Sequence, residues 1–150
     1  MVDVQKLRQI NLFIDLTDDE LQAISEFCTI KEFADGEVIL YDVGEEIVRD
    51  LFLLIDGALR VRKRVSKIRP WKRIDIKAID NEVFGEVGWL LGTAPSAEVS
   101  SDGESQMLVV DGKKLFSLCE KNNSIGNHIH YRIAAILALR VTYHTTLLNE

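Results

Sequence analysis

Cysteine, proline and histidine are scarce in this chain of 150 residues, which has two, two and three of them. Cys28 and Cys119 stand far apart and without a CxxC spacing, so they predict two reduced thiols packed as small apolar groups, not a disulfide framework or a zinc site. His128, His130 and His144 lack the spacing at which a helix presents two metal ligands. The sequence therefore indicates no metal site and no cofactor.

Catalytic motifs and membrane spans are also missing. The chain shows no nucleophile beside a base, no Walker motif and no dinucleotide-binding glycine pattern. Residues 100–102 and 18–20 are better explained as a turn and a helix cap than as catalytic groups. No apolar run is long enough to span a bilayer, and the N-terminus lacks the pattern of a signal peptide. We expect a cytoplasmic protein that has no catalytic residue, is not an enzyme and does not contact a membrane.

The formal net charge of −6 argues against a surface that binds nucleic acid in general. Half of the basic residues nevertheless fall between 60 and 77 together with Trp71, a composition typical of hairpins that track phosphates and stack bases. The alternation Arg60-Val61-Arg62 is equally what a half-buried strand with a solvated face requires. We favour the solvated hairpin, so nucleic acid is not an expected partner.

The first part of the chain carries clear helix signals. Thr17 and Glu20 form a capping-box pattern, and Leu16 and Leu21 form a hydrophobic staple around it. These signals predict a helix from residue 18 to about 27, after a shorter helix near the N-terminus. The overall composition, with 47% hydrophobic and 28% charged residues, is that of one globular domain.

From residue 29 the periodicity changes to short β-rich runs separated by glycine-containing turns. Asp35-Gly36, Asp56-Gly57 and Asp102-Gly103 are each interpreted as turns. The predicted strands are residues 30–33, 38–41, 51–55, 59–65, 71–79, 98–101 and 107–110. Regular short strands of this kind predict an antiparallel roll or barrel.

The last part of the chain is predicted to be helical. Asp111 is a candidate N-cap for a helix over 113–121, and Ser124 is a candidate N-cap for a long helix that ends near residue 148. The long helix carries an apolar stripe of Ile125, Ile129, Ile133, Ile136, Leu137 and Val141. This stripe can cover the roll, and its length beyond the roll predicts a homodimer through residues 125–148.

Residues 83–99, VFGEVGWLLGTAPSAEV, resemble the phosphate-binding cassette of the cyclic-nucleotide-binding family, the family of catabolite activator protein and of protein kinase A regulatory subunits. The family pattern is approximately FGE-x-A-L-L-x-x-x-P-R-A-A-T-V and aligns without a gap. Weaker matches cover nearly the whole chain, at 12–13, 16–21, 36–39, 44, 53–57, 108–111 and 116. The resemblance implies a mainly β fold, a β-roll of the double-stranded β-helix or jelly-roll type with flanking helices.

The resemblance also implies a ligand-binding set formed by Gly85, Glu86, Val87, Gly88, Pro95, Ser96 and Ala97. Glu86 would accept a hydrogen bond from the ribose 2′-hydroxyl, and Gly85 and Gly88 would lie against the sugar phosphate. The residue types of the cassette suit an anionic ligand, because a glycine permits close backbone approach and the N–H groups that begin a helix favour an anion.

The cassette departs from the family at one decisive position. Pro95 stands where the family has the arginine that pairs with the cyclic phosphate, and proline also removes a backbone donor. Glu98, on the face of Ser96, would further oppose a phosphate. Because an ionic hydrogen bond contributes about 1.5–3 kcal/mol, we expect binding of cyclic AMP or cyclic GMP to be weak, altered or lost.

We therefore predict one domain over residues 1–150, with N-terminal helices at 1–28, a β-roll at 29–111 that contains the cassette at 84–99, and C-terminal helices at 112–150. Its predicted function is that of a regulatory, ligand-sensing module acting on an unidentified effector protein. Two alternatives stay open: a working cyclic-nucleotide sensor in which another cation, such as Arg49, replaces the missing arginine, and a dimerising protein-interaction scaffold.

Overall fold

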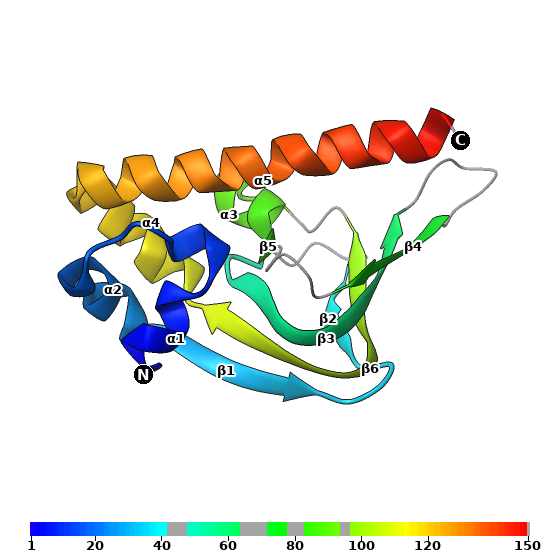
Figure 1. Ribbon diagram of the computed structural model, residues 1–150, viewed down its shortest axis with the longest axis horizontal. Helices are drawn as coiled ribbons and strands as arrows, with labels where there is room; N and C mark the ends of the chain where they lie inside the picture. The colour runs from blue at the N-terminus through cyan, green and yellow to red at the C-terminus, as the bar shows by residue number, and fades with distance from the viewer. Residues whose placement is uncertain (42–47, 64–71, 78–82, 94–96, 150) are drawn as a thin grey trace.

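The computed structural model describes residues 1–41, 48–63, 72–77, 83–93 and 97–149. Its elements follow the predicted order of helices, sheet and helices (Figure 1). The fold class predicted from the sequence, an antiparallel β-roll with flanking helices, is confirmed.

Three short helices begin the chain: α1 (Val4–Arg8), the 3-10 helix η1 (Asn11–Phe13) and α2 (Asp18–Ser25). The predicted capping box of α2 is present, since the Glu20 N–H donates to Thr17 Oγ1 at 3.2 Å and the Thr17 N–H donates to Glu20 Oε1 at 2.9 Å. The helix ends at Ser25, two residues earlier than predicted.

The sheet comprises β1 (Cys28–Phe33), β2 (Val38–Leu40), β3 (Leu51–Lys63), β4 (Lys72–Lys77), β5 (Val83–Phe84) and β6 (Glu98–Val110). All of its pairings are antiparallel. The strand order is β1-β6-β3-β4, with β2 paired to β6 and β5 paired to β3. The two long central strands curve strongly and give the sheet its rolled shape (Figure 1).

Two of the predicted Asp-Gly turns are wrong. Asp56-Gly57 lies inside β3 and Asp102-Gly103 lies inside β6. Each of these continuous strands corresponds to two of the strands predicted from the sequence. The pairing register between these strands shifts on both sides of Asp56. Gly57 has φ +106°, and a side chain there would collide with the backbone of residues 104 and 105. The glycines therefore bend paired strands instead of connecting them.

The later helices are α3 (Glu86–Leu91), α4 (Gly112–Lys121) and α5 (Asn123–Asn149). The predicted cap of α4 is confirmed, because Asp111 Oδ1 accepts from the Lys114 N–H at 3.2 Å. The predicted cap of α5 is wrong. Ser124 lies within the helix, and Asn122 supplies the cap by accepting from the Ile125 N–H at 3.1 Å.

Two apolar clusters fill the domain. One lies inside the roll and includes Phe52, Leu54, Phe84 and Met107. The other joins the roll to the helices, and its buried members on α5 are Ile125, Ile129, Ile133 and Ile136. The predicted stripe thus covers the domain as far as Ile136, with Leu137 partly buried, whereas Val141 is 65% exposed and is not part of it.

Both cysteines are free and buried in the second cluster, as predicted. Burial raises the pKa of the Cys28 thiol to about 12 and that of Cys119 to about 11, so neither is a reactive thiolate near neutral pH. Among the residues that the structure describes, no group of three or more His, Cys, Asp or Glu side chains could hold a metal ion. Within the same ranges, no helix has the length and apolar character of a membrane span.

Candidate functional site

The cassette begins where β5 meets α3. Phe84 pairs with Phe52 of β3, and the chain then turns at Gly85, which has φ +88° and precedes the first residue of α3, Glu86. The Gly85 carbonyl accepts from the Trp89 N–H at 3.1 Å, which closes the first turn of the helix. This tight strand-to-helix junction places Glu86 in a buried position, with only 7% of the residue exposed.

The two cassette glycines are required by the fold itself. A Cβ at Gly85 would collide with the backbone carbonyl oxygen of Asp50, and one at Gly88 would collide with that of Val48. The segment just before β3 therefore packs directly against the backbone of α3. This packing explains both glycines without a ligand, and their predicted contact with a sugar phosphate stays a prediction.

The carboxylate of Glu86 is bound by an arginine that sequence reasoning missed. Arg140 on α5 donates from Nη1 to Glu86 Oε1 at 2.9 Å and from Nη2 to the Val83 carbonyl at 2.6 Å. Its Cζ lies 5.4 Å from the centroid of the Phe84 ring, within the range of a cation–π contact. The Arg140 and Glu86 side chains are 14% and 10% exposed. One guanidinium thus contacts residues 83, 84 and 86, which surround the strand-to-helix junction.

The remaining predicted site residues fall in three different settings. Val87 is half-buried on α3. Ala97 is buried in the apolar cluster inside the roll, so it serves the core whatever else it contacts. Pro95 and Ser96 lie outside the residues that the structure describes. The charge of Glu98 is partly balanced, because its carboxylate lies 3.9 Å from Arg62 on the neighbouring strand.

Arg49, the cation that the sequence suggested as a substitute, lies at the other end of α3. Its Nη2 would be 2.8 Å from a Cβ placed on Gly92, the residue that ends the helix with φ +68°. A cation is favourable beside the carbonyl groups that end a helix. The described geometry therefore separates Arg49 from Glu86 by the length of α3.

Trp89 fixes α3 to the helices that follow the roll. The indole is 1% exposed, and its Nε1 donates to the Gly112 carbonyl at 2.8 Å. Its ring lies edge-on to Phe116 of α4 at 5.8 Å between centroids, and at 5.3 Å from the His130 ring of α5. The cassette is therefore connected to α4 and α5 through one side chain, while Arg140 forms a second connection to α5.

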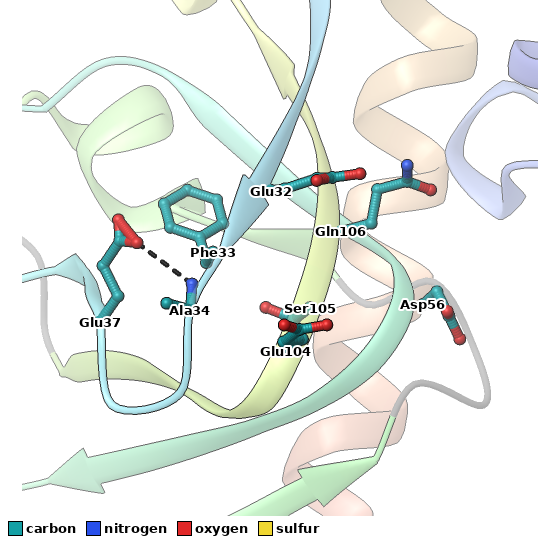
Figure 2. A pocket seen from close by; sticks show the side chains of 8 residues that line it. All are labelled: Glu32, Phe33, Ala34, Glu37, Asp56, Glu104, Ser105 and Gln106. Atoms are coloured by element: carbon teal, nitrogen blue, oxygen red, sulfur yellow. Dashed lines mark hydrogen bonds between the residues drawn. The ribbon is translucent and has the colours of Figure 1, made fainter.

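A separate hollow lies between β1, β3 and β6 (Figure 2). It is a cavity of about 450 Å³ lined by Glu32, Phe33, Ala34, Glu37, Asp56, Glu104, Ser105 and Gln106. Within it the Ala34 N–H donates to Glu37 Oε1 at 3.2 Å (Figure 2). Four carboxylate side chains make this hollow unfavourable for a phosphate, so it does not compete with the cassette as the site of an anionic ligand.

The basic hairpin shows paired charges where its side chains are described. Arg60 lies 2.7 Å from Asp102, and Arg62 lies near Glu98. Cations that face carboxylates across the sheet are less available to phosphates. At these two positions the charges are those of a solvated strand face, and the other basic side chains of residues 60–77 lie outside those that the structure describes.

Comparison with solved structures identifies the fold. A cyclic nucleotide-binding domain from Methylobacillus flagellatus superposes with a TM-score of 0.79 at 18% identity, covering 98% of this chain and 82% of that one. Catabolite activator protein of Thermus thermophilus gives 0.70 at 18% identity, covering 93% of this chain and 62% of that one. The regulatory domain of Toxoplasma gondii PKA with cAMP gives a TM-score of 0.69 at 15% identity, covering 88% of this chain and 48% of that one.

The fold is therefore that of cyclic-nucleotide-binding domains, as the sequence resemblance implied. The chain spans less than two thirds of the length of the last two structures. No family model matches the sequence, and no curated protein matches it either. At 15–18% identity the likeness concerns the fold, so the ligand has to be argued from the residues of the cassette.

Proposed function

We propose that this domain is a regulatory, ligand-sensing module of the cyclic-nucleotide-binding type and not an enzyme. The observation that carries this proposal is the placement of Glu86, whose buried carboxylate is held at the start of α3 in a fold shared with cyclic-nucleotide-binding proteins. A carboxylate in this position is suited to accept hydrogen bonds from a sugar hydroxyl. Trp89 and Arg140 then connect the cassette to the helices from which a signal would be passed to an effector protein.

The proposed ligand is cyclic AMP or cyclic GMP, bound weakly. The support for weak binding is Pro95, which occupies the position of the family's phosphate-binding arginine in the gapless alignment. Of the two arginines near the cassette, Arg140 is paired with Glu86, and Arg49 lies beside Gly92 at the end of α3, where it stays the alternative source of a positive charge. Among the described residues of the cassette, Glu86 is the side chain proposed to recognise the ligand, through its ribose.

Restoring the arginine is the first test of this function. We expect Pro95→Arg to tighten binding of cyclic AMP or cyclic GMP by about tenfold to several hundredfold, because a charge-assisted hydrogen bond to the phosphate is regained. Titration calorimetry on both proteins, with thermal unfolding in the presence of each nucleotide, measures the change.

Glu86→Gln in the Pro95→Arg background serves as the control and should weaken binding again. Tight binding by the unmodified protein that Pro95→Arg does not change would show that another cation fills the role of the arginine. If neither protein binds a nucleotide, the domain is not a cyclic-nucleotide sensor, and the scaffold function below is favoured.

A second candidate function is self-association through α5, residues 125–148, as a dimerising scaffold. The observation that favours it is the exposure of large apolar side chains on this helix, with Tyr131 70% and Leu139 71% exposed. These two residues are eight positions apart and therefore share a helix face. Such a face is a surface that a second copy of the helix could cover.

Dimerisation is tested by sedimentation velocity of the protein over a range of concentrations. We expect a dimer that Tyr131→Glu and Leu139→Glu together convert into a monomer, because two buried carboxylates would oppose the apolar contact. Leu91→Glu, which changes a residue 72% exposed on α3, is the matched control and should leave the dimer intact. A monomer at all concentrations would contradict the scaffold function.

A further inference from the structure

Arg140 is an unusual residue for the face of α5 on which it lies. The residues of this face that contact the domain are Ile125, Ile129, Ile133 and Ile136, and Arg140 follows at the next helical step. Where the periodicity predicts another apolar residue, the chain has a guanidinium that is 14% exposed. A charge in this position is costly unless it is paired, and its partners include Glu86 and the Val83 carbonyl.

The two partners depend on each other. The Glu86 side chain is 10% exposed, and its Oε1 accepts from Arg140. Removing Arg140 would leave the Glu86 carboxylate buried without this counter-ion, which destabilises the contact far more than the loss of an exposed pair. The attachment of α5 near residue 140 is therefore sensitive to whatever else binds the Glu86 carboxylate.

A second ion pair on the same helix provides a comparison. Arg132 donates to Asp15 at 3.0 Å and so also connects α5 to another part of the domain. Its side chains are 26% and 74% exposed, so solvent screens this pair and it contributes little. Arg132 and Arg140 are thus two arginines of the same helix, the first in an exposed ion pair and the second in a buried one.

We propose that the Arg140–Glu86 ion pair is a latch that holds the C-terminal part of α5 against the cassette, and that a hydroxyl-bearing ligand competes with Arg140 for Glu86. The second half of this proposal rests on the function proposed above. A ligand that hydrogen-bonds to Glu86 weakens the ion pair between this carboxylate and the Arg140 guanidinium, and so loosens α5. By thermodynamic reciprocity, loosening α5 raises the affinity for the ligand by the same factor.

The latch itself is tested without any ligand, by hydrogen exchange of the amides of residues 137–149. Arg140→Gln and Glu86→Gln should each speed this exchange by about tenfold or more, and the double variant should exchange no faster than the quicker single variant. Arg132→Gln is the matched control and should leave the exchange nearly unchanged. Unchanged exchange in both single variants, or additive effects in the double variant, would overturn the latch.

Arg140→Lys distinguishes a specific weakening of the ion pair from a general loss of folding. The lysine keeps the positive charge but lacks the planar fork that reaches Glu86 and the Val83 carbonyl together. We expect its exchange rates to fall between those of the unmodified protein and of Arg140→Gln, with circular dichroism unchanged. Rates equal to those of Arg140→Gln would show that the charge does not contribute to the latch.

Competition is tested with cyclic AMP and its 2′-deoxy analogue. Arg140→Gln should bind cyclic AMP about tenfold more tightly than the unmodified protein, and the deoxy analogue should show no such gain. Equal or weaker binding of cyclic AMP by Arg140→Gln overturns the competition and leaves the proposed function standing. If cyclic AMP binds to none of the unmodified protein, Arg140→Gln and Pro95→Arg, the proposed function and the competition both fail, and hydrogen exchange alone decides the latch.

Discussion

Replacing Gly112 by alanine is expected to lower the free energy of unfolding by about 3 kcal/mol or more, because the position has no room for a side chain. A Cβ there would overlap the backbone carbonyl oxygen of Arg49 and lie 2.9 Å from Cδ1 of Trp89. The backbone of Gly112 cannot move aside easily. Its N–H donates to Asp50 Oδ1 at 3.2 Å, and its carbonyl accepts from the Trp89 indole at 2.8 Å.

Gly103→Ala is the matched control, since it strains a backbone with positive φ but causes no steric overlap. Gly103 has φ +76° and no heavy atom within 4 Å of the position of a Cβ, so its cost should be only the 1–2 kcal/mol or so of a left-handed conformation. Urea denaturation of the two variants and the unmodified protein measures the difference. Equal destabilisation by both substitutions would contradict a close contact between Gly112 and Arg49.

The parts of the fold that the sequence predicted correctly are those set by neighbouring residues. Thr17 and Glu20 lie three positions apart and cap α2 by hydrogen bonds within one turn. Asp111 caps α4 in the same local way. The apolar face of α5 was readable as far as Ile136 because the helical period alone decides which residues share a face.

The errors arose where distant residues decide the local structure. Asp-Gly is a strong turn signal, but Gly57 lies opposite a bulge of β6 and continues β3. Tertiary pairing therefore overrode turn preference. Ser124 and Asn122 are both acceptable caps, and the choice between them depends on the geometry by which α4 passes into α5.

The candidate site was predictable only in part. The cassette pattern located Gly85 and Glu86, and the structure places them at the predicted strand-to-helix junction. The partner of Glu86 was missed because it is 54 residues away. One signal was present in the sequence: Arg140 continues the helical spacing of Ile129, Ile133 and Ile136, and a charged residue at an apolar position calls for a buried partner.

The connection between cassette and helices predicts a second large effect, at Trp89. Trp89→Ala should lower the free energy of unfolding by about 3–5 kcal/mol, because it removes the largest fully buried side chain of the described residues and leaves a cavity between α3, α4 and α5. Trp89→Phe keeps much of the ring but removes the donor to the Gly112 carbonyl. Its expected cost is about 1–3 kcal/mol, that of a buried acceptor left without a partner.

Leu91→Ala is the control on the same helix, because its side chain is 72% exposed, and it should change stability by no more than about 0.5 kcal/mol. Denaturation followed by circular dichroism gives all three values without relying on tryptophan fluorescence. If Trp89→Phe costs as much as Trp89→Ala, the indole hydrogen bond and not the volume of the ring fixes α3. If both cost as little as Leu91→Ala, α3 is not anchored through Trp89, and Arg140 becomes the main described connection between the cassette and α5.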